Sequence, residues 1–158
     1  MARAASEAGT RPYRILVVED EYFIADDLVQ ALAAVGAEVV GPLPDPAAAL
    51  DLILSGTSID IAILDINLQD RDVYPLADTL VERDIPFVFA AGYDRSAVPE
   101  AYRDVPRWEK PYNPHELARA VPGIVEKHAS RAPSGIAATA DRREPDGAPT
   151  EGGARTNG

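Results

Sequence analysis

Three acidic residues and one lysine of this 158-residue chain each come directly after a segment with strand character: Glu19, Asp20, Asp65 and Lys110. Carboxylates held within a few Å of one another repel strongly, so they are tolerated only beside a cation or with one of them protonated. Hard oxygen ligands with an open coordination sphere favour Mg²⁺, which also binds phosphoryl oxygens, and a nearby lysine adds a point charge for the same group. Taken singly, each residue has an ordinary structural explanation as a helix-end charge, a turn or a loop. If the fold brings them together, they predict magnesium-assisted phosphoryl chemistry.

The middle of the chain alternates short apolar runs with helical stretches. Strand character is found over residues 14–18, 38–41, 59–64, 86–90 and 107–109. Helical patterns are found over about 24–35, 45–54, 75–83 and 113–125, and residues 92–104 allow only a short, weak helix. This alternation predicts an α/β fold in which helices cover both faces of a parallel sheet. The reactive site of such a fold lies outside the carboxyl ends of the strands, which is where the four residues above are expected.

Local signals mark several helix ends. Asp45 and Asn113 each precede a proline, which predicts an N-cap followed by proline at the first helical position. Gly36 predicts the end of the first helix. Pro122 stands inside the last apolar pattern and is expected to kink or shorten that helix.

Composition divides the chain into an N-terminal arm at 1–12, one folded domain at 13–128 and a tail at 129–158 that is rich in Pro, Gly, Ala and Arg. Both ends are expected to be disordered, because they hold too few large apolar side chains to offset chain entropy. Residues 13–130 hold 9 basic and 21 acidic residues, a net charge of −12 that disfavours direct nucleic-acid binding. The chain has no cysteine and no long apolar run, so we expect a cytoplasmic protein without disulfides or a membrane span.

In combination, three motifs resemble the receiver domain of two-component response regulators. They are Val17-Val18-Glu19-Asp20-Glu21, Ile63-Leu64-Asp65-Ile66-Asn67-Leu68 and Lys110-Pro111-Tyr112. The resemblance covers roughly residues 13–128 and implies a doubly wound, five-stranded parallel sheet of the flavodoxin-like kind, with strand order 2-1-3-4-5. It further implies a phosphoryl acceptor, not a turnover enzyme, whose partner is a sensor histidine kinase or a histidine phosphotransfer protein.

The resemblance also implies a role for each matching residue. Asp65 would be the phosphoacceptor and also a ligand of Mg²⁺. Asp20 would bind Mg²⁺ directly and Glu19 through a coordinated water, while the backbone carbonyl of Asn67 would complete the site. Lys110 would bridge Asp65 and the phosphoryl oxygens, and the peptide bond between Lys110 and Pro111 is expected to be cis.

The sequence departs from the receiver pattern at two positions. Ala91 stands where receivers usually carry a threonine or serine that hydrogen-bonds the phosphoryl group, and Arg107 stands where many carry a switch aromatic. The string over residues 86–93 resembles the Phe-Ala-Thr-Gly-Tyr subfamily, which is known mostly as single-domain regulators of alphaproteobacteria paired with HWE-type histidine kinases. Tyr93 is expected either to take over the signalling role or to pack as an ordinary core or loop tyrosine.

Two other hypotheses compete with the prediction of a stand-alone regulator that is phosphorylated. The first is a pseudo-receiver that docks on a kinase without switching, which Ala91 favours. The second is a small phosphohydrolase, which is disfavoured because that class places its nucleophile after the first strand with a second aspartate two residues on, where this chain has Asn67. His115 and His128 belong to no metal-spaced cluster, so neither is expected to be a ligand.

Overall fold

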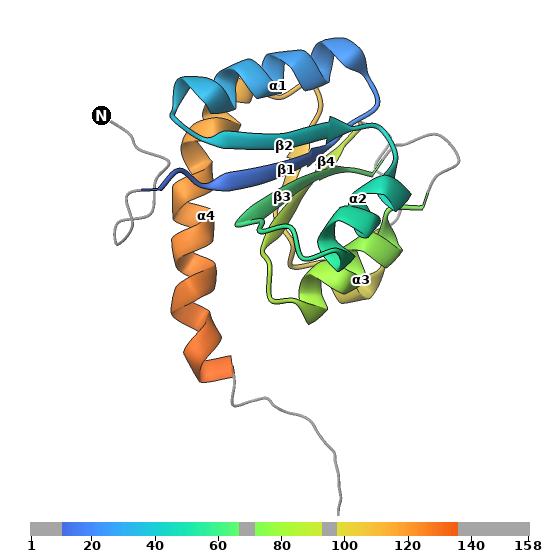
Figure 1. Ribbon diagram of the computed structural model, residues 1–158, viewed down its shortest axis with the longest axis vertical. Helices are drawn as coiled ribbons and strands as arrows, with labels where there is room; N and C mark the ends of the chain where they lie inside the picture. Colours follow the sequence, from blue (N-terminus) through green and yellow to red (C-terminus); the bar gives the residue numbers. More distant parts are fainter. Residues whose placement is uncertain (1–10, 67–71, 93–97, 136–158) are drawn as a thin grey trace, which may run out of the picture. The chain divides into compact units, whose positions relative to one another are not determined.

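The computed structural model describes residues 11–66, 72–92 and 98–135 (Figure 1). The strands are β1 (Arg14–Val18), β2 (Glu38–Leu43), β3 (Ile61–Asp65), β4 (Phe87–Ala91) and β5 (Arg107–Glu109). The helices are α1 (Tyr22–Ala34), α2 (Pro46–Leu54), α3 (Tyr74–Glu82), the 3₁₀ turn η1 (Glu100–Tyr102) and α4 (Pro114–Gly135). The chain divides after Pro122 into two units; the first holds the whole sheet and the second begins within α4.

The five strands form one parallel sheet in the order β2-β1-β3-β4-β5, which confirms the predicted fold and strand order. All strands except β2 and β5 are buried along nearly their whole length. That burial on both faces is what the nearly continuous apolar runs of the sequence predict.

Alternate residues of the central strands serve two apolar layers, because successive side chains of a strand point to opposite faces. Leu16 and Val18 of β1 join a core cluster with residues of α2 and α3, such as Ile53 and Leu80. Helix α1 lies on the other side of the sheet from α2 and α3 (Figure 1). The fully buried Ile15 belongs to that opposite layer. The sheet is therefore held from both sides and its strand ends are fixed.

Three helix ends follow the predicted signals. The Asp45 carboxylate accepts a hydrogen bond from the Ala47 amide at 3.0 Å, and the Asn113 side chain accepts one from the His115 amide at 2.8 Å. Both are N-caps that satisfy an otherwise orphan backbone donor. Gly36, just after α1, has a φ of +87°, a conformation that glycine adopts readily.

Of the two effects expected of Pro122, a kink or a shortened helix, the second is absent. Helix α4 is not shortened at Pro122 and reaches Gly135, so residues 129–135 are helical instead of belonging to a disordered tail. Leu117 and Val121 are completely buried and stabilise the turns before the proline. After the proline, Glu126, Lys127, Ala129 and Arg131 are good helix formers, which favour continuation of the helix.

At the amino-terminal edge of the sheet, one carboxylate joins two strands. Asp60, just before β3, accepts hydrogen bonds from Arg11 at 2.8 and 2.9 Å and from the backbone amide of Arg14 at 2.7 Å. Burial opposes ionisation of Asp60, but the two arginines and the amide outweigh burial and lower its pKa.

Among the helices of the described residues, none combines the length and the apolar character that a membrane span needs.

Candidate functional site

The register of the sheet brings the four predicted residues to one edge. Val18, the last residue of β1, pairs with Leu64, so Glu19 and Asp20 leave β1 beside Asp65 at the end of β3. On the other side, Ala91 at the end of β4 pairs with Glu109, the last residue of β5, and Lys110 follows directly. Residues separated by up to 91 positions in the chain therefore meet at the carboxyl edge.

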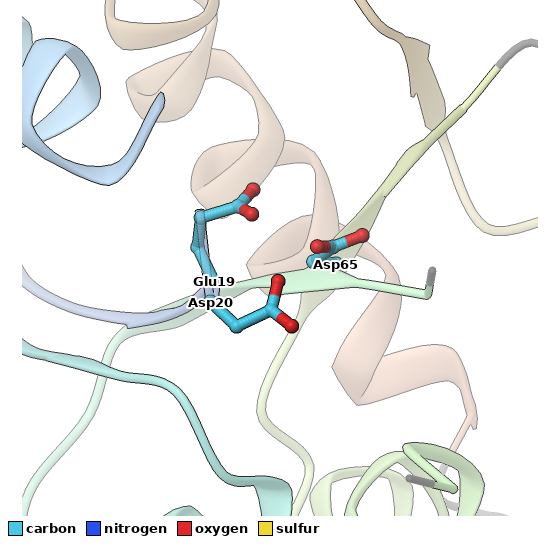
Figure 2. Close-up of side chains that lie close together, drawn as sticks. All are labelled: Glu19, Asp20 and Asp65. Atoms are coloured by element: carbon cyan, nitrogen blue, oxygen red, sulfur yellow. The ribbon is translucent and has the colours of Figure 1, made fainter. Parts of the chain in front are cut away.

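Three carboxylates converge there. Glu19, Asp20 and Asp65 each place one oxygen within 4.8 Å of the others, and the carboxylates of the two residues that follow β1 lie beside that of Asp65 (Figure 2). Asp65 is 1% exposed and Glu19 is 5% exposed, whereas Asp20 is not buried. Two of the three carboxylates are thus shielded from water, and the third is less buried.

Lys110 links the two buried carboxylates. Its Nζ lies 3.1 Å from Oδ2 of Asp65 and 3.1 Å from Oε1 of Glu19, and its side chain is only 13% exposed. Its backbone amide donates to the carbonyl of Ala91 at 2.7 Å, which anchors the residue to the end of β4. The Glu21 amide donates to the other oxygen of Glu19 at 3.1 Å. Lys110 is therefore fixed at both ends: its backbone bonds to β4, and its ammonium group contacts two carboxylates.

The charges of the site are unbalanced. Burial, together with the hydrogen bond and charge of Asp65, raises the pKa of Glu19 to about 7, although the Glu21 amide and Lys110 act in the opposite direction. Burial alone would lower the pKa of Lys110, but the carboxylates of Asp65 and Glu19 outweigh it and raise that pKa. One ammonium thus does not offset three acidic groups, and a cation would relieve the remaining repulsion. An all-oxygen donor set of this kind is compatible with Mg²⁺.

The other predicted residues are placed less completely. Ala91 is 2% exposed at the end of β4 and presents no hydroxyl to the site, and Arg107 is exposed on β5. Asn67 and Tyr93 lie outside the described residues. The peptide bond between Lys110 and Pro111 is cis, as the resemblance implied.

One residue beside the site received no role in the sequence analysis, although it belongs to a quoted motif. The hydroxyl of Tyr112 is buried and has no hydrogen-bond partner among the described residues. The only signal in the sequence was its position two residues after Lys110, which does not distinguish a polar role from a packing one.

Comparison with known proteins identifies the family. The solution structure of SdrG from Sphingomonas melonis Fr1 is 38% identical to this chain, covering 72% of it and 96% of SdrG, with a TM-score of 0.62. The chain belongs to the response-regulator receiver family. The BeF3-activated conformation of SdrG is similar at 39% identity, with 71% and 95% of the two chains covered and a TM-score of 0.60.

A more distant receiver shows the same fold. A CheY-like receiver domain from Methanospirillum hungatei JF-1 is 21% identical, with 76% of this chain and 98% of that one covered and a TM-score of 0.64. The transcriptional regulatory protein PdtaR of Mycobacterium tuberculosis is 28% identical over 114 residues, which are 72% of this chain. The receiver chain spans 55% of the length of PdtaR. No protein-family model matches the sequence.

Proposed function

We propose that this receiver accepts a phosphoryl group on Asp65 from a phosphohistidine of a sensor histidine kinase or a histidine phosphotransfer protein, with Mg²⁺ bound beside it. The observation that carries the proposal is the convergence of three carboxylates within 4.8 Å around a nearly inaccessible Asp65 whose Oδ2 is held by Lys110 at 3.1 Å. Histidine kinases and phosphotransfer proteins are the usual partners of receivers, and this chain has the receiver fold and the acidic pocket.

The residues of the site would divide the chemistry as follows. Asp20, Asp65 and, through water, Glu19 would hold Mg²⁺, with the backbone carbonyl of Asn67 completing the set. When bound, the ion would neutralise charge on the phosphoryl oxygens. An oxygen of Asp65 would form the bond to phosphorus as the bond from the histidine nitrogen breaks. Lys110, already hydrogen-bonded to Asp65, would supply N–H donors to the transferred group. The product would be an acyl phosphate, which is labile, so the modification would be temporary.

Phosphotransfer from candidate HWE-type kinases tests this proposal directly. The wild-type chain should gain the mass of one phosphoryl group in the presence of Mg²⁺ and none when the metal is chelated. Asp65→Asn should gain none. Asp51→Asn removes an exposed carboxylate on α2 and is the matched control, expected to behave as wild type. Equal labelling of wild type and Asp65→Asn would contradict the assignment of Asp65.

We further propose that the chain acts through protein contacts as a cytoplasmic regulator of the Phe-Ala-Thr-Gly-Tyr kind, and that it turns over no substrate. The similarity to SdrG and the motif at residues 86–93 support this placement. The net charge of −12 over residues 13–130 argues against direct contact with nucleic acid.

A pseudo-receiver remains the second candidate, because Ala91 is buried at the position of the missing hydroxyl. In that case the chain would dock on a kinase without a phosphorylation-dependent change. Kinase binding would then be unaffected by Asp65→Ala, whereas a working switch would make the affinity of the two states differ. Titration of a kinase with phosphorylated and unphosphorylated chain separates the two.

A further inference from the structure

The described part of the connection from β4 to β5, residues 98–106, contains the turn η1 and no α-helix. Its backbone hydrogen bonds stay within the segment, such as that from the Tyr102 amide to the Pro99 carbonyl at 2.9 Å. The exception is at its end, where the Pro106 carbonyl accepts the Phe89 amide of β4 at 2.9 Å. The attachment of this segment, called the β4–β5 connection below, therefore depends mainly on side chains.

Tyr102 is the anchor of the β4–β5 connection. Its side chain is 6% exposed, whereas every other residue of the connection is half-buried or exposed. Its ring stacks on that of Tyr74 at 5.5 Å and 21°, and it meets the rings of Phe89 and Phe87 edge-on at 6.0 and 6.2 Å. Tyr74 is the first residue of α3 and both phenylalanines belong to β4. One side chain thus fastens the connection to two elements through stabilising ring contacts.

Strand β5 has little else to hold it. It has three residues, lies at the edge of the sheet and pairs with β4 alone. Arg107 and Glu109 are exposed, and Trp108 is half-buried. Arg107 pairs with Phe89, the same residue whose ring meets that of Tyr102. A short strand with so few buried contacts has low local stability, so the connection that precedes it determines where β5 begins.

The position of β5 matters because Lys110 follows it directly. The Lys110 amide donates to the Ala91 carbonyl at 2.7 Å, and its ammonium contacts the two buried carboxylates at 3.1 Å. On the proposed function both carboxylates also serve Mg²⁺, so the backbone of Lys110 has to hold the side chain in place. A displacement of about 1 Å in a group of this kind can lower a rate about 100-fold.

We propose that Tyr102 is a positioning residue for Lys110. Its ring holds the β4–β5 connection on β4 and α3, the connection sets the start of β5, and β5 sets the backbone of Lys110. Tyr102 itself takes no part in the chemistry. The consequence for phosphoryl transfer rests on the proposed function, whereas the placement of Lys110 is a property of the metal-free chain and is tested there.

The test compares Tyr102→Ala, which removes the ring, with Tyr102→Phe, which keeps it. Tyr102→Leu, which keeps apolar volume without a ring, is used if the alanine variant does not fold. The matched control is Ile53→Ala, because Ile53 is 1% exposed on α2 in the same apolar cluster and its truncation also destabilises the core. Hydrogen exchange of the Phe89 and Lys110 amides in the metal-free chain reports the two backbone bonds described above.

Without metal, both amides should exchange about 10- to 100-fold faster in Tyr102→Ala than in Ile53→Ala, because the contacts of a buried ring are lost locally. The emission of Trp108, the one tryptophan of the chain, should shift in Tyr102→Ala and not in Ile53→Ala. Tyr102→Phe should match wild type in both measurements.

With metal, the effects on two ligands should separate. Tyr102→Ala should bind Mg²⁺ as tightly as wild type or more tightly, because the three carboxylates stay in place while the ammonium is displaced. It should bind beryllofluoride, a mimic of the acyl phosphate, about 3- to 10-fold more weakly, the ratio expected for one hydrogen bond. Phosphoryl transfer should be about 10- to 100-fold slower. Tyr102→Phe should restore all three values.

Equal exchange of the two amides in Tyr102→Ala and Ile53→Ala would make Tyr102 an ordinary core residue and overturn the inference. Mg²⁺ and beryllofluoride affinities that fall in the same proportion would overturn it too, since a general loss of structure weakens both. If wild type itself does not respond to Mg²⁺ and beryllofluoride, the proposed function fails. The exchange and fluorescence of the metal-free chain then still decide whether Tyr102 positions Lys110.

Discussion

Replacing Lys110 by methionine should have opposite effects on Mg²⁺ binding and on phosphoryl transfer. Nζ lies 3.1 Å from Oδ2 of Asp65, and a magnesium–oxygen bond is about 2.1 Å, so an ion bound by Asp65 would lie within about 5–7 Å of Nζ. At that separation, charges of +1 and +2 repel by about 1.2–1.6 kcal/mol even at the dielectric of bulk water. Removing the ammonium should therefore tighten Mg²⁺ binding by about tenfold. Phosphoryl transfer should fall, because the donors to the phosphoryl oxygens are lost.

The same substitution should destabilise the metal-free protein. Removing one partner from a buried ion pair costs about 3–5 kcal/mol, and Lys110 serves two buried carboxylates. Protonation of Glu19 limits this loss of unfolding free energy, because a protonated Glu19 carries no unpaired charge. The pKa of Glu19 is already about 7, and it should rise further when the ammonium is removed. A carboxyl whose pKa is raised on folding makes stability fall as pH rises through the interval between its unfolded and folded pKa values. We therefore expect a loss of about 3 kcal/mol at pH 8 and a smaller loss at pH 6.

Mg²⁺ titrations followed by Trp108 fluorescence, and urea unfolding at the two pH values, measure these effects. Lys127→Met removes the same charge from an exposed position of α4 and serves as the control for net charge. Mg²⁺ binding to Lys110→Met that is equal to or weaker than wild type would refute the reasoning, since the ammonium would then not act on the cation. An unfolding free energy independent of pH between 6 and 8 would refute the account of Glu19.

Four further substitutions, of which Gly36→Ala is a control for Gly41→Ala, test other parts of the molecule. Gly41→Ala should destabilise by about 2–4 kcal/mol in urea unfolding, because φ there is +102° and a Cβ would lie 2.9 Å from the carbonyl oxygen of Val17. Gly36→Ala, where a Cβ meets nothing within 4 Å, should lose only about 1 kcal/mol. Asp60→Asn should lose about 1–3 kcal/mol at pH 7. This difference from wild type should vanish as pH falls through the lowered pKa of Asp60, because a carboxylate with a depressed pKa stabilises only above it. Ala91→Ser should bind beryllofluoride about 3- to 10-fold more tightly by adding a hydroxyl donor, and unchanged affinity would show that position 91 does not face the phosphoryl group.

Much of the site could be predicted because polar residues at the ends of buried strands have few alternative positions. Once the apolar runs define a parallel sheet, Asp65 and Lys110 must leave it at the carboxyl edge. The sequence could not show that Lys110 contacts Glu19 as well as Asp65, since that depends on rotamers and burial. The same limit hid the unpaired hydroxyl of Tyr112, which only the packing of its surroundings defines.

The end of α4 illustrates a different limit. Pro122 correctly marks a position where one helical hydrogen bond is lost, and local propensity alone favours a stop there. The apolar stripe buried before the proline and the helix formers after it outweigh that loss, so the helix continues. Composition likewise indicated a tail from residue 129, but composition does not show where a helix that has already begun will end.

A threonine or serine at position 91 could do two things: keep Lys110 and Asp65 in place, and donate a hydrogen bond to a phosphoryl group. The contacts of Ala91 show that the first does not need a hydroxyl. Its carbonyl accepts the Lys110 amide at 2.7 Å, and the neighbouring Ala90 carbonyl accepts the Ile66 amide at 3.0 Å just after Asp65. Both contacts are made by backbone, so an alanine keeps Lys110 and Asp65 in place as well as a threonine would. On the proposed function, what alanine removes is a side-chain donor for the phosphoryl group. The backbone geometry at this edge is therefore independent of the substitution, and on the proposed function any response to a bound phosphoryl group depends on donors other than residue 91.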